Sequence, residues 1–277
     1  YDESFNYALL TTEPGSTMKL ATLLSVLSEG SVKIDDMVEV GSTGQMVVGP
    51  RPVTDAERSP SAVLSVRDCF AHSSNIGMSK VGYKSFAGRG EKFAEYLSKF
   101  RLDSISGIDL PGENKPNHVP LGKKGNPKDM VTMFFGYAIE VSPLQTLTLY
   151  NAIANNGTMV KPYLVNSVQQ NGVTLREYKP VVLRENLCKP EVINAARSSM
   201  EAVVQYGTAK AAFKGMTFPV AGKTGTAHVS DGKITYDDGI YQASFVGYFP
   251  ADKPQYSCIV VVRSKPHAAA HFGGLLA

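Results

Sequence analysis

Apolar residues recur at helical spacing near the start of the chain and again through its middle. A first set of leucines lies three or four positions apart and is followed by a glycine, which predicts a helix from Ser16 to about Ser28. The set comprises Leu20, Leu23, Leu24 and Leu27, with Gly30 as the stop signal. Similar patterns predict helices at about 66–71, 75–83, 93–100, 143–155 and 191–206.

Beyond position 218 the pattern changes to short runs of apolar and β-branched residues. These runs predict three strands, at 219–229, 242–249 and 255–263, with a tight turn at 250–254. The stretches 31–62 and 101–127 are rich in glycine and proline and are predicted to be largely irregular. A helical middle followed by a sheet indicates an α+β fold with a helical lobe.

Composition and charge narrow the possible partners. The 277 residues are 43% hydrophobic and 19% charged, as in an ordinary globular protein. A net charge of +3, without a basic run interleaved with aromatic residues, argues against nucleic-acid binding. No apolar run approaches the ~18 residues of a membrane span. Because the chain opens on Tyr1 without an initiator methionine or a signal peptide, we expect it to be a piece of a longer protein.

The cysteines and the late histidines give little sign of a metal site. Cys69, Cys188 and Cys258 share no metal or disulfide spacing. Cys258 lies in an apolar run, so we expect it to be a buried core thiol. His267 and His271 are four apart, as metal ligands on a helix can be, but glycines follow at once and favour a surface position.

Ser16 and Lys19 form the first candidate for chemistry. They lie three residues apart at the predicted helix start, so both side chains cover the same face. The positive end of the helix dipole disfavours an ammonium, which favours the neutral amine that a base must be. The free N–H groups of the first turn would stabilise negative charge on the serine oxygen. The alternative is a simple N-cap, and the same spacing recurs at Ser230 and Lys233.

Ser73-Ser74-Asn75, between two predicted helices, is the second candidate. A hydroxyl and an amide two residues apart can serve as a proton relay and a hydrogen-bonding group for a substrate. Alone the triplet means little, because Ser4-Phe5-Asn6 has the same form and such triplets are commonly caps or turns.

The third candidate lies on the first late strand, at Lys223-Thr224-Gly225-Thr226. Side chains alternate on a strand, so Lys223 shares a face with Gly225, and the two threonines share the other. A glycine inside a strand allows another backbone to come close, and a lysine with two hydroxyls would suit a substrate carboxylate. The alternative is an ordinary strand with one exposed lysine. A phosphate-binding Walker loop is excluded, because position 217 is threonine where that loop needs glycine.

In the order Ser-x-x-Lys, Ser-x-Asn, Lys-Thr-Gly, the three motifs resemble the signature of penicillin-binding proteins and serine β-lactamases. Further stretches are similar to class B penicillin-binding proteins. These stretches are 13–19, 109–113, 136–137 with 141–145, 154–157, 221–227 and 245–250. Among them, Gly136-Tyr137 together with 141–145 looks most like the septal, cell-division type.

The resemblance implies a single transpeptidase domain over 1–277, truncated at both ends. Its fold would be an antiparallel sheet flanked by helices, plus a helical lobe, with the active site between them. We expect the helical lobe at roughly 60–155 and the sheet lobe from 1–30 and 160–277. With outer strands and a final helix absent, the sheet would have exposed edges.

The resemblance also implies a catalytic role for four residues. Ser16 would attack the carbonyl of the penultimate D-Ala in a peptidoglycan stem peptide, and Lys19 would take the hydroxyl proton. Ser73 would pass a proton to the leaving amine, with Lys223 holding the field around it. The identity of the acylation base is disputed in this superfamily. β-Lactams would acylate Ser16, and no metal or organic cofactor is implied.

The remaining implied roles are in substrate binding. Asn75 would hydrogen-bond the substrate backbone, while Thr224 and Thr226, with Gly225 between them, would hold its terminal carboxylate. The backbone N–H groups of Ser16 and Thr226 would form the oxyanion hole.

Two other functions remain open. Glu113 and Asn117 have the Glu-x-x-x-Asn form of the deacylating loop in class A β-lactamases. A non-catalytic lactam sensor or scaffold would keep the fold without turnover. For the transpeptidase, the resemblance implies the extracytoplasmic face of the bacterial inner membrane, an upstream anchor, and partners in a cell-wall synthesis or division complex.

Overall fold

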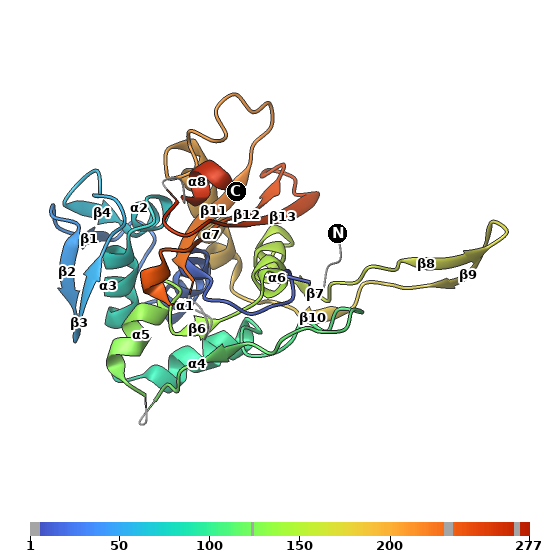
Figure 1. The fold of residues 1–277 in the computed structure, drawn as a ribbon, viewed down its shortest axis with the longest axis horizontal. Helices are drawn as coiled ribbons and strands as arrows, with labels where there is room; N and C mark the ends of the chain where they lie inside the picture. Colours follow the sequence, from blue (N-terminus) through green and yellow to red (C-terminus); the bar gives the residue numbers. More distant parts are fainter. Residues whose placement is uncertain (1–5, 123–124, 230–234, 269–271) are drawn as a thin grey trace.

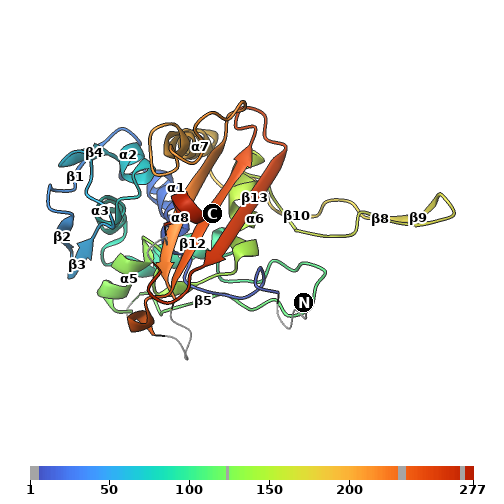
Figure 2. The same cartoon turned by 45° about the horizontal axis from the view of Figure 1, so that its top comes forward.

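A three-stranded antiparallel sheet occupies the C-terminal part of the chain (Figure 2). The computed structural model describes residues 6–122, 125–229, 235–268 and 272–277. The strands run in the order β11 (Ala221–His228), β12 (Tyr241–Phe249) and β13 (Tyr256–Arg263). Gly225 pairs with Ser244, and Cys258 pairs with Gly247. The three predicted strands are confirmed to within two residues at each end.

Two long helices pack against this sheet, and a third follows a short turn that contacts β11. A single 3₁₀ turn, η1 (Gly15–Met18), leads into α1 (Lys19–Glu29), so the α-helix begins slightly later than predicted. α6 (Pro143–Ala154) packs against β12 and β13, and α7 (Pro190–Gln205) packs against β11 (Figures 1 and 2). By these contacts α6 lies with the sheet, although its range falls within the predicted helical lobe.

The other helices pack against one another, and some of them against α1. They are α2 (Val66–Ala71), α3 (Asn75–Phe86), α4 (Gly90–Lys99) and α5 (Pro127–Met133). α1 packs against α3 and α4, and Phe86, Phe93 and Phe134 form a buried aromatic cluster between them. Gly82 allows the close approach, because a Cβ at this position would lie 2.5 Å from the ring of Phe134. This core fixes the helix that follows the candidate nucleophile.

Among the residues that the structure describes, five small antiparallel pairs of strands surround this body. They are β1 (Met37–Glu39) with β4 (Val63–Ser65), β2 (Gln45–Val48) with β3 (Arg51–Thr54), β5 (Asn117–His118) with β6 (Ile139–Glu140), β7 (Met159–Val160) with β10 (Val182–Arg184), and β8 (Ser167–Gln170) with β9 (Val173–Glu177). The β8–β9 hairpin projects from the body (Figure 1). A short 3₁₀ turn, η2 (Tyr236–Asp238), lies between β11 and β12 along the chain, and α8 (Gly273–Leu276) packs against both strands.

The prediction of a buried thiol at Cys258 is wrong. Cys258 is exposed, whereas Cys69 and Cys188 are buried, and all three thiols are free. Alternation on β13 turns Ile259 and Val261 toward the start of α6. Cys258 therefore shares the opposite face with Val260, which is 41% exposed.

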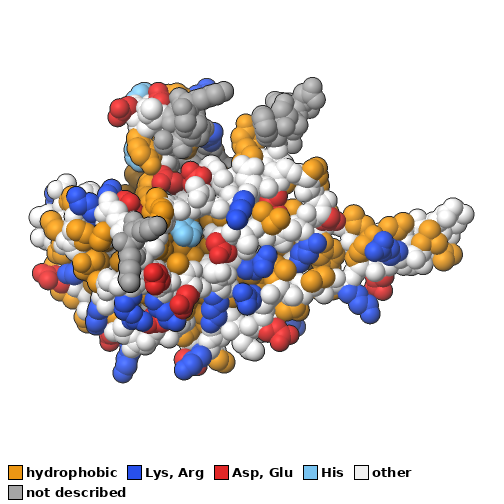
Figure 3. Space-filling view, turned by 90° about the horizontal axis from the view of Figure 1, so that it is seen from below, with side chains coloured by type: hydrophobic (Ala, Val, Ile, Leu, Met, Phe, Trp, Pro, Cys, Tyr) orange, Lys and Arg blue, Asp and Glu red, His pale blue; other side chains and the backbone are white. Residues whose placement is uncertain are grey.

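Charges on the surface are mixed in sign. On the face shown in Figure 3, Lys and Arg side chains are interspersed with Asp and Glu. Within the described ranges, no helix has both the length and the apolar character needed to cross a membrane.

Candidate active site

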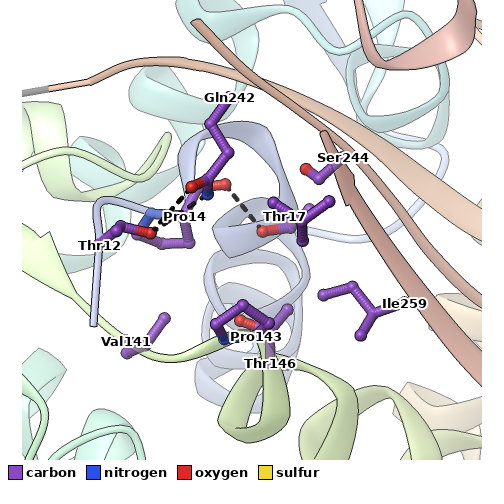
Figure 4. A pocket seen from close by; sticks show the side chains of 10 residues that line it. Thr12, Pro14, Thr17, Val141, Pro143, Thr146, Gln242, Ser244 and Ile259 are labelled. Atoms are coloured by element: carbon purple, nitrogen blue, oxygen red, sulfur yellow. Dashed lines mark hydrogen bonds between the residues drawn. The ribbon is translucent and has the colours of Figure 1, made fainter. Parts of the chain in front are cut away.

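The nucleophile turn is held against both the sheet and α6. Gly15, at φ +56°, reverses the chain directly before Ser16. Thr17 Oγ1 donates to the Pro14 carbonyl at 2.9 Å, and the buried Tyr150 hydroxyl of α6 donates to the Thr17 carbonyl at 2.8 Å. Behind the turn lies a cavity of about 10 Å³, between Pro14 and Thr17 on one side and Ser244 of β12 on the other (Figure 4). The turn is therefore packed from behind, and Ser16 is left partly exposed.

Lys19 brings the first two motifs together. Its Nζ lies near four oxygens: the Ser73 carbonyl at 2.5 Å, Asn75 Oδ1 at 2.7 Å, Ser16 Oγ at 2.9 Å and Ser73 Oγ at 3.0 Å. The carbonyl and amide oxygens can only accept, so they take the two N–H groups of a neutral amine. The one remaining lone pair can then accept a proton from the hydroxyl of Ser16 or from that of Ser73, which lie at similar distances. This geometry is what a serine nucleophile with a lysine base requires.

Burial lowers the pKa of Lys19, which favours its role as a base. The side chain is fully buried, and this desolvation lowers the pKa of Lys19 to about 7. The nearby negative charges of Asp55 and, when ionised, Cys69 act in the opposite direction and raise it. Because the base is the neutral amine, its population increases as the pH rises through about 7.

The turn between α2 and α3 carries Ser73 in a strained conformation. Ser73 has φ +57°, which is uncommon for a residue with a side chain and is found at functional sites. Ser74 caps α3, since its hydroxyl accepts from the N–H of Gly77 at 2.9 Å. Asn75 Nδ2 donates to the Thr54 carbonyl at 2.8 Å, which orients Asn75 Oδ1 toward Lys19.

Asp55 anchors this turn and was not predicted from the sequence. Its buried carboxylate accepts from the Ser74 hydroxyl at 2.8 Å and from the N–H of Ile76 at 2.9 Å. It therefore sits at the N-terminus of α3, where a negative charge is favoured. Asp55 lies in an irregular stretch with no periodicity, so no sequence pattern marked it.

We expect Asp55→Asn to shift the pH dependence of Ser16 acylation. Removing the carboxylate removes the attraction that raises the pKa of Lys19, so that pKa falls. The ascending limb of acylation rate against pH should then move to lower pH by about half to one unit. Asparagine keeps an acceptor for Ile76. Rates of labelling by a fluorescent penicillin, measured over about pH 5 to 9, would show the shift.

Asp252→Asn, in the exposed turn between β12 and β13, is the matched control. If Asp55→Asn melts like the wild type but the ascending limb of its acylation rate stays at the same pH, then Asp55 does not act on the pKa of Lys19 through its charge.

Lys223 of β11 lies against α2, close enough to Lys19 to be affected by its charge. It is fully buried, its Nζ lies 5.7 Å from the ring centroid of Phe70 in α2, and it donates to the Thr224 carbonyl at 2.9 Å. Burial and the nearby charge of Lys19 hold the pKa of Lys223 well below its usual range. Within the described ranges, the hydrogen bonds of Lys223 go to Thr224 and not to Ser73. The predicted influence of Lys223 on Ser73 would therefore act through its electric field rather than through a hydrogen bond.

Gly225 makes room for two side chains rather than for another backbone. A Cβ at this position would lie 2.4 Å from Ser244 Oγ and 3.0 Å from Thr17 Cγ2. A Cβ at Gly15 would likewise lie 3.1 Å from the Thr226 carbonyl oxygen. The nucleophile turn and β11 are therefore in contact, which brings the backbone of Ser16 and Thr226, the predicted oxyanion-hole donors, into one region.

Thr224 and Thr226 lie on the opposite face of β11 from Lys223, as strand alternation predicts. Thr224 Oγ1 pairs with Thr208 Oγ1 at 2.6 Å, and Thr226 Oγ1 accepts from the N–H of Gly273 at 3.1 Å. Thr208 follows α7 and was not singled out from the sequence. Gly207 makes its position possible, because a Cβ there would lie 2.3 Å from the Ala71 carbonyl oxygen.

Glu113 has a structural role in this fold. Its two carboxylate oxygens accept from the backbone N–H groups of Ser106 at 2.6 Å and Gly107 at 2.9 Å. These bonds fix a turn and use both oxygens. Ser4, Ser230, Lys233 and His271, which were weighed in the sequence, lie outside the described residues.

Comparison with known proteins agrees with this geometry. The family model for the penicillin-binding protein transpeptidase domain matches residues 6–275. The chain therefore belongs to the penicillin-binding protein transpeptidase family, and its α+β fold is the fold of that family.

Relatives and solved structures extend the match over almost the whole chain. Stage V sporulation protein D of Bacillus subtilis is 32% identical over 96% of this chain and 40% of its own length. The probable peptidoglycan D,D-transpeptidase PbpC of Pseudomonas aeruginosa is 30% identical over 96% and 44%. Penicillin-binding protein 3 of Mycobacterium tuberculosis, solved with aztreonam, superposes with a TM-score of 0.81 at 28% identity, covering 97% of this chain and 61% of that one. The chain thus spans less than half the length of these curated relatives.

Proposed function

We propose that this chain is the catalytic domain of a peptidoglycan D,D-transpeptidase that is acylated by β-lactams. The observation that carries the proposal is the contact of one buried lysine, Lys19, with the hydroxyls of both Ser16 and Ser73. Family membership and relatives named as peptidoglycan D,D-transpeptidases support it.

In the first half-reaction, Ser16 Oγ forms a bond to the carbonyl carbon of the penultimate D-Ala of a stem peptide. Lys19 takes the hydroxyl proton, and the C–N bond to the terminal D-Ala breaks. Ser73 delivers a proton to the leaving amine. Because Lys19 Nζ touches both hydroxyls, the proton can pass between them without large motion.

In the second half-reaction, an amine from a neighbouring stem peptide attacks the ester carbon. The new C–N bond forms the cross-link, the C–O bond to Ser16 breaks, and the amine proton returns to Ser16 through Lys19. The N–H groups of Ser16 and Thr226 would hold the oxyanion in both steps. Loss of one such donor commonly costs ~10²–10³ in rate. Asn75, Thr224, Gly225 and Thr226 would hold the stem peptide and its carboxylate.

A β-lactam would enter by the same route, with Ser16 opening the strained ring. Its leaving nitrogen stays tethered in the acyl-enzyme, so the adduct is expected to persist. The M. tuberculosis structure with aztreonam supports lactam binding by this fold.

The first test is intact mass after incubation with excess benzylpenicillin, followed by peptide mapping. We expect one long-lived adduct on Ser16, none in Ser16→Ala, and an unchanged adduct in the control Ser61→Ala, which alters an exposed serine. An adduct that turns over within seconds would favour a β-lactamase. A folded protein with no adduct would favour a non-catalytic role.

The cellular setting forms part of the proposal. We propose a role in septal cross-linking at the extracytoplasmic face of the inner membrane, within a cell-wall synthesis or division complex and held by an upstream anchor. Similarity to the peptidoglycan D,D-transpeptidase FtsI of Buchnera aphidicola supports this. We also propose that residues 1–277 act as one domain, with a sheet lobe from 1–30 and 160–277 and a helical lobe near 60–155, whose last helix, α6, also packs against the sheet.

A further inference from the structure

The residues before Ser16 run alongside a second chain segment, 136–141. Thr12 and Val141 exchange backbone hydrogen bonds at 3.2 and 3.0 Å, and the N–H of Gly15 donates to the Gly136 carbonyl at 3.0 Å. A Cβ at Gly136 would lie 1.9 Å from the Gly15 carbonyl oxygen, so the two backbones are in tight contact. Gly136 therefore packs directly on Gly15, the residue before the nucleophile.

Glu13 ties a third segment into this contact. Its Oε1 accepts from the N–H of Ala138 at 2.9 Å, and its Oε2 accepts from the hydroxyl of Tyr236 at 2.7 Å. Ala138 has φ +60°, an uncommon conformation for alanine, which the bond to Glu13 helps to hold. Tyr236 belongs to the loop between β11 and β12, so one carboxylate joins that loop to the nucleophile segment.

The end of β11 and the start of β12, on either side of this loop, also contact the residues around Glu13. At the β11 end, the N–H of His228 donates to the Tyr137 hydroxyl at 3.4 Å, and the His228 ring lies 6.0 Å from that of Tyr236. At the β12 end, Gln242 Nε2 donates to Thr12 Oγ1 at 3.2 Å (Figure 4). The strand ends on both sides of the loop therefore contact residues 12 and 137, and Tyr236 within the loop contacts Glu13.

We propose that Glu13 is a positioning residue that couples the β11–β12 loop to the turn carrying Ser16. When Tyr236 is bonded, Glu13 holds Ala138 and thereby the Gly136–Gly15 contact, and the turn places Ser16 Oγ for attack. When the bond to Tyr236 is lost, the turn is held less firmly and acylation slows. The inference rests on the proposed function, because its readout is the rate at which Ser16 is acylated.

Tyr236→Phe is the key variant, because it removes only a hydroxyl from a side chain that is 48% exposed. We expect the limiting acylation rate at saturating fluorescent penicillin to fall about 5- to 10-fold. The half-saturating concentration and the melting temperature should stay unchanged. Tyr256→Phe, which alters an exposed tyrosine at the far end of the sheet, is the matched control and should behave as wild type.

A double-mutant cycle with Glu13 tests the coupling. Glu13→Ala removes both hydrogen bonds and should slow acylation by about 10²-fold, while Glu13→Gln, which keeps an acceptor for Ala138, should recover part of the rate. Adding Tyr236→Phe to Glu13→Ala should have no further effect. Where Glu13→Ala folds poorly, Glu13→Gln takes its place in the cycle, and the effect of Tyr236→Phe should then be reduced.

Three results would overturn the coupling: wild-type rates in Tyr236→Phe, multiplicative effects in the double mutant, or a lower melting temperature with unchanged acylation of the folded protein. In each case wild type is still acylated on Ser16, so the proposed function stands while the inference fails. Wild-type protein that is never acylated would instead overturn both.

Discussion

Replacing Lys19 by arginine is expected to reduce acylation of Ser16 at neutral pH by at least about 10³-fold. The guanidinium has a pKa above ~12 and keeps its proton even where burial lowers the pKa of a lysine. Lys19 itself has a pKa of about 7, so a large fraction is the neutral amine at that pH. The measurement is the pseudo-first-order rate of labelling by a fluorescent penicillin.

This substitution separates two roles for Lys19. If Lys19 acted only through its positive charge, arginine would preserve most of the rate; if it acts as a base, arginine cannot replace it. Because a buried arginine is larger and can unfold the site, Lys19→Met provides a second test that fills a similar volume without an amine. Both variants should lose acylation while melting cooperatively. Lys33→Arg, on an exposed lysine, should change nothing.

The contact between Ser16 and Lys19 could be predicted because it is local. Residues three apart at a helix start share a face whatever the rest of the chain does, and the observed 2.9 Å follows from that spacing. The alternation of side chains along β11 likewise predicted that Lys223 and Gly225 share one face of the strand and that the two threonines lie on the other. In these cases one periodicity within one element was sufficient.

Asp55 and Thr208 could not be predicted, because their roles depend on contacts between distant segments. Asp55 reaches the N-terminus of α3 only because the β2–β3 hairpin folds against that helix. Thr208 meets Thr224 only because Gly207 lets the end of α7 touch the Ala71 carbonyl. Neither residue lies in a periodic pattern, and threonine or aspartate in a loop commonly serves a turn.

Cys258 shows the limit of alternation as a guide to burial. Its run of apolar residues predicted a core strand, but one face of β13 is open and Cys258 lies on it. Alternation divides a strand into two faces without saying which of them another element covers. The sequence therefore predicted the strand and not its burial.

Gly136→Ala is expected to give the largest loss caused by a single methyl group in this chain. The added Cβ would lie 1.9 Å from the Gly15 carbonyl oxygen, and the backbone at φ +96° already disfavours a side chain. Because the neighbour is backbone, no side-chain rotation can relieve the clash, and the Gly15–Ser16 turn must move. We expect a loss of several kcal/mol in the free energy of unfolding, about 3 or more, and acylation slower by at least about 10²-fold in the protein that remains folded.

Gly215→Ala is the control that isolates the clash, because Gly215 has a similar φ of +88° but nothing within 4 Å of the added Cβ. It should cost only about 1 kcal/mol and leave the acylation rate unchanged. Denaturant unfolding and fluorescent-penicillin labelling, carried out on both variants below their melting temperatures, give the comparison. Equal stability and equal rates for the two would mean that the Gly136–Gly15 contact does not hold the nucleophile. A rate loss confined to Gly136→Ala would place the orientation of Ser16 under the control of a backbone contact 120 residues away in the sequence, from Ser16 to Gly136.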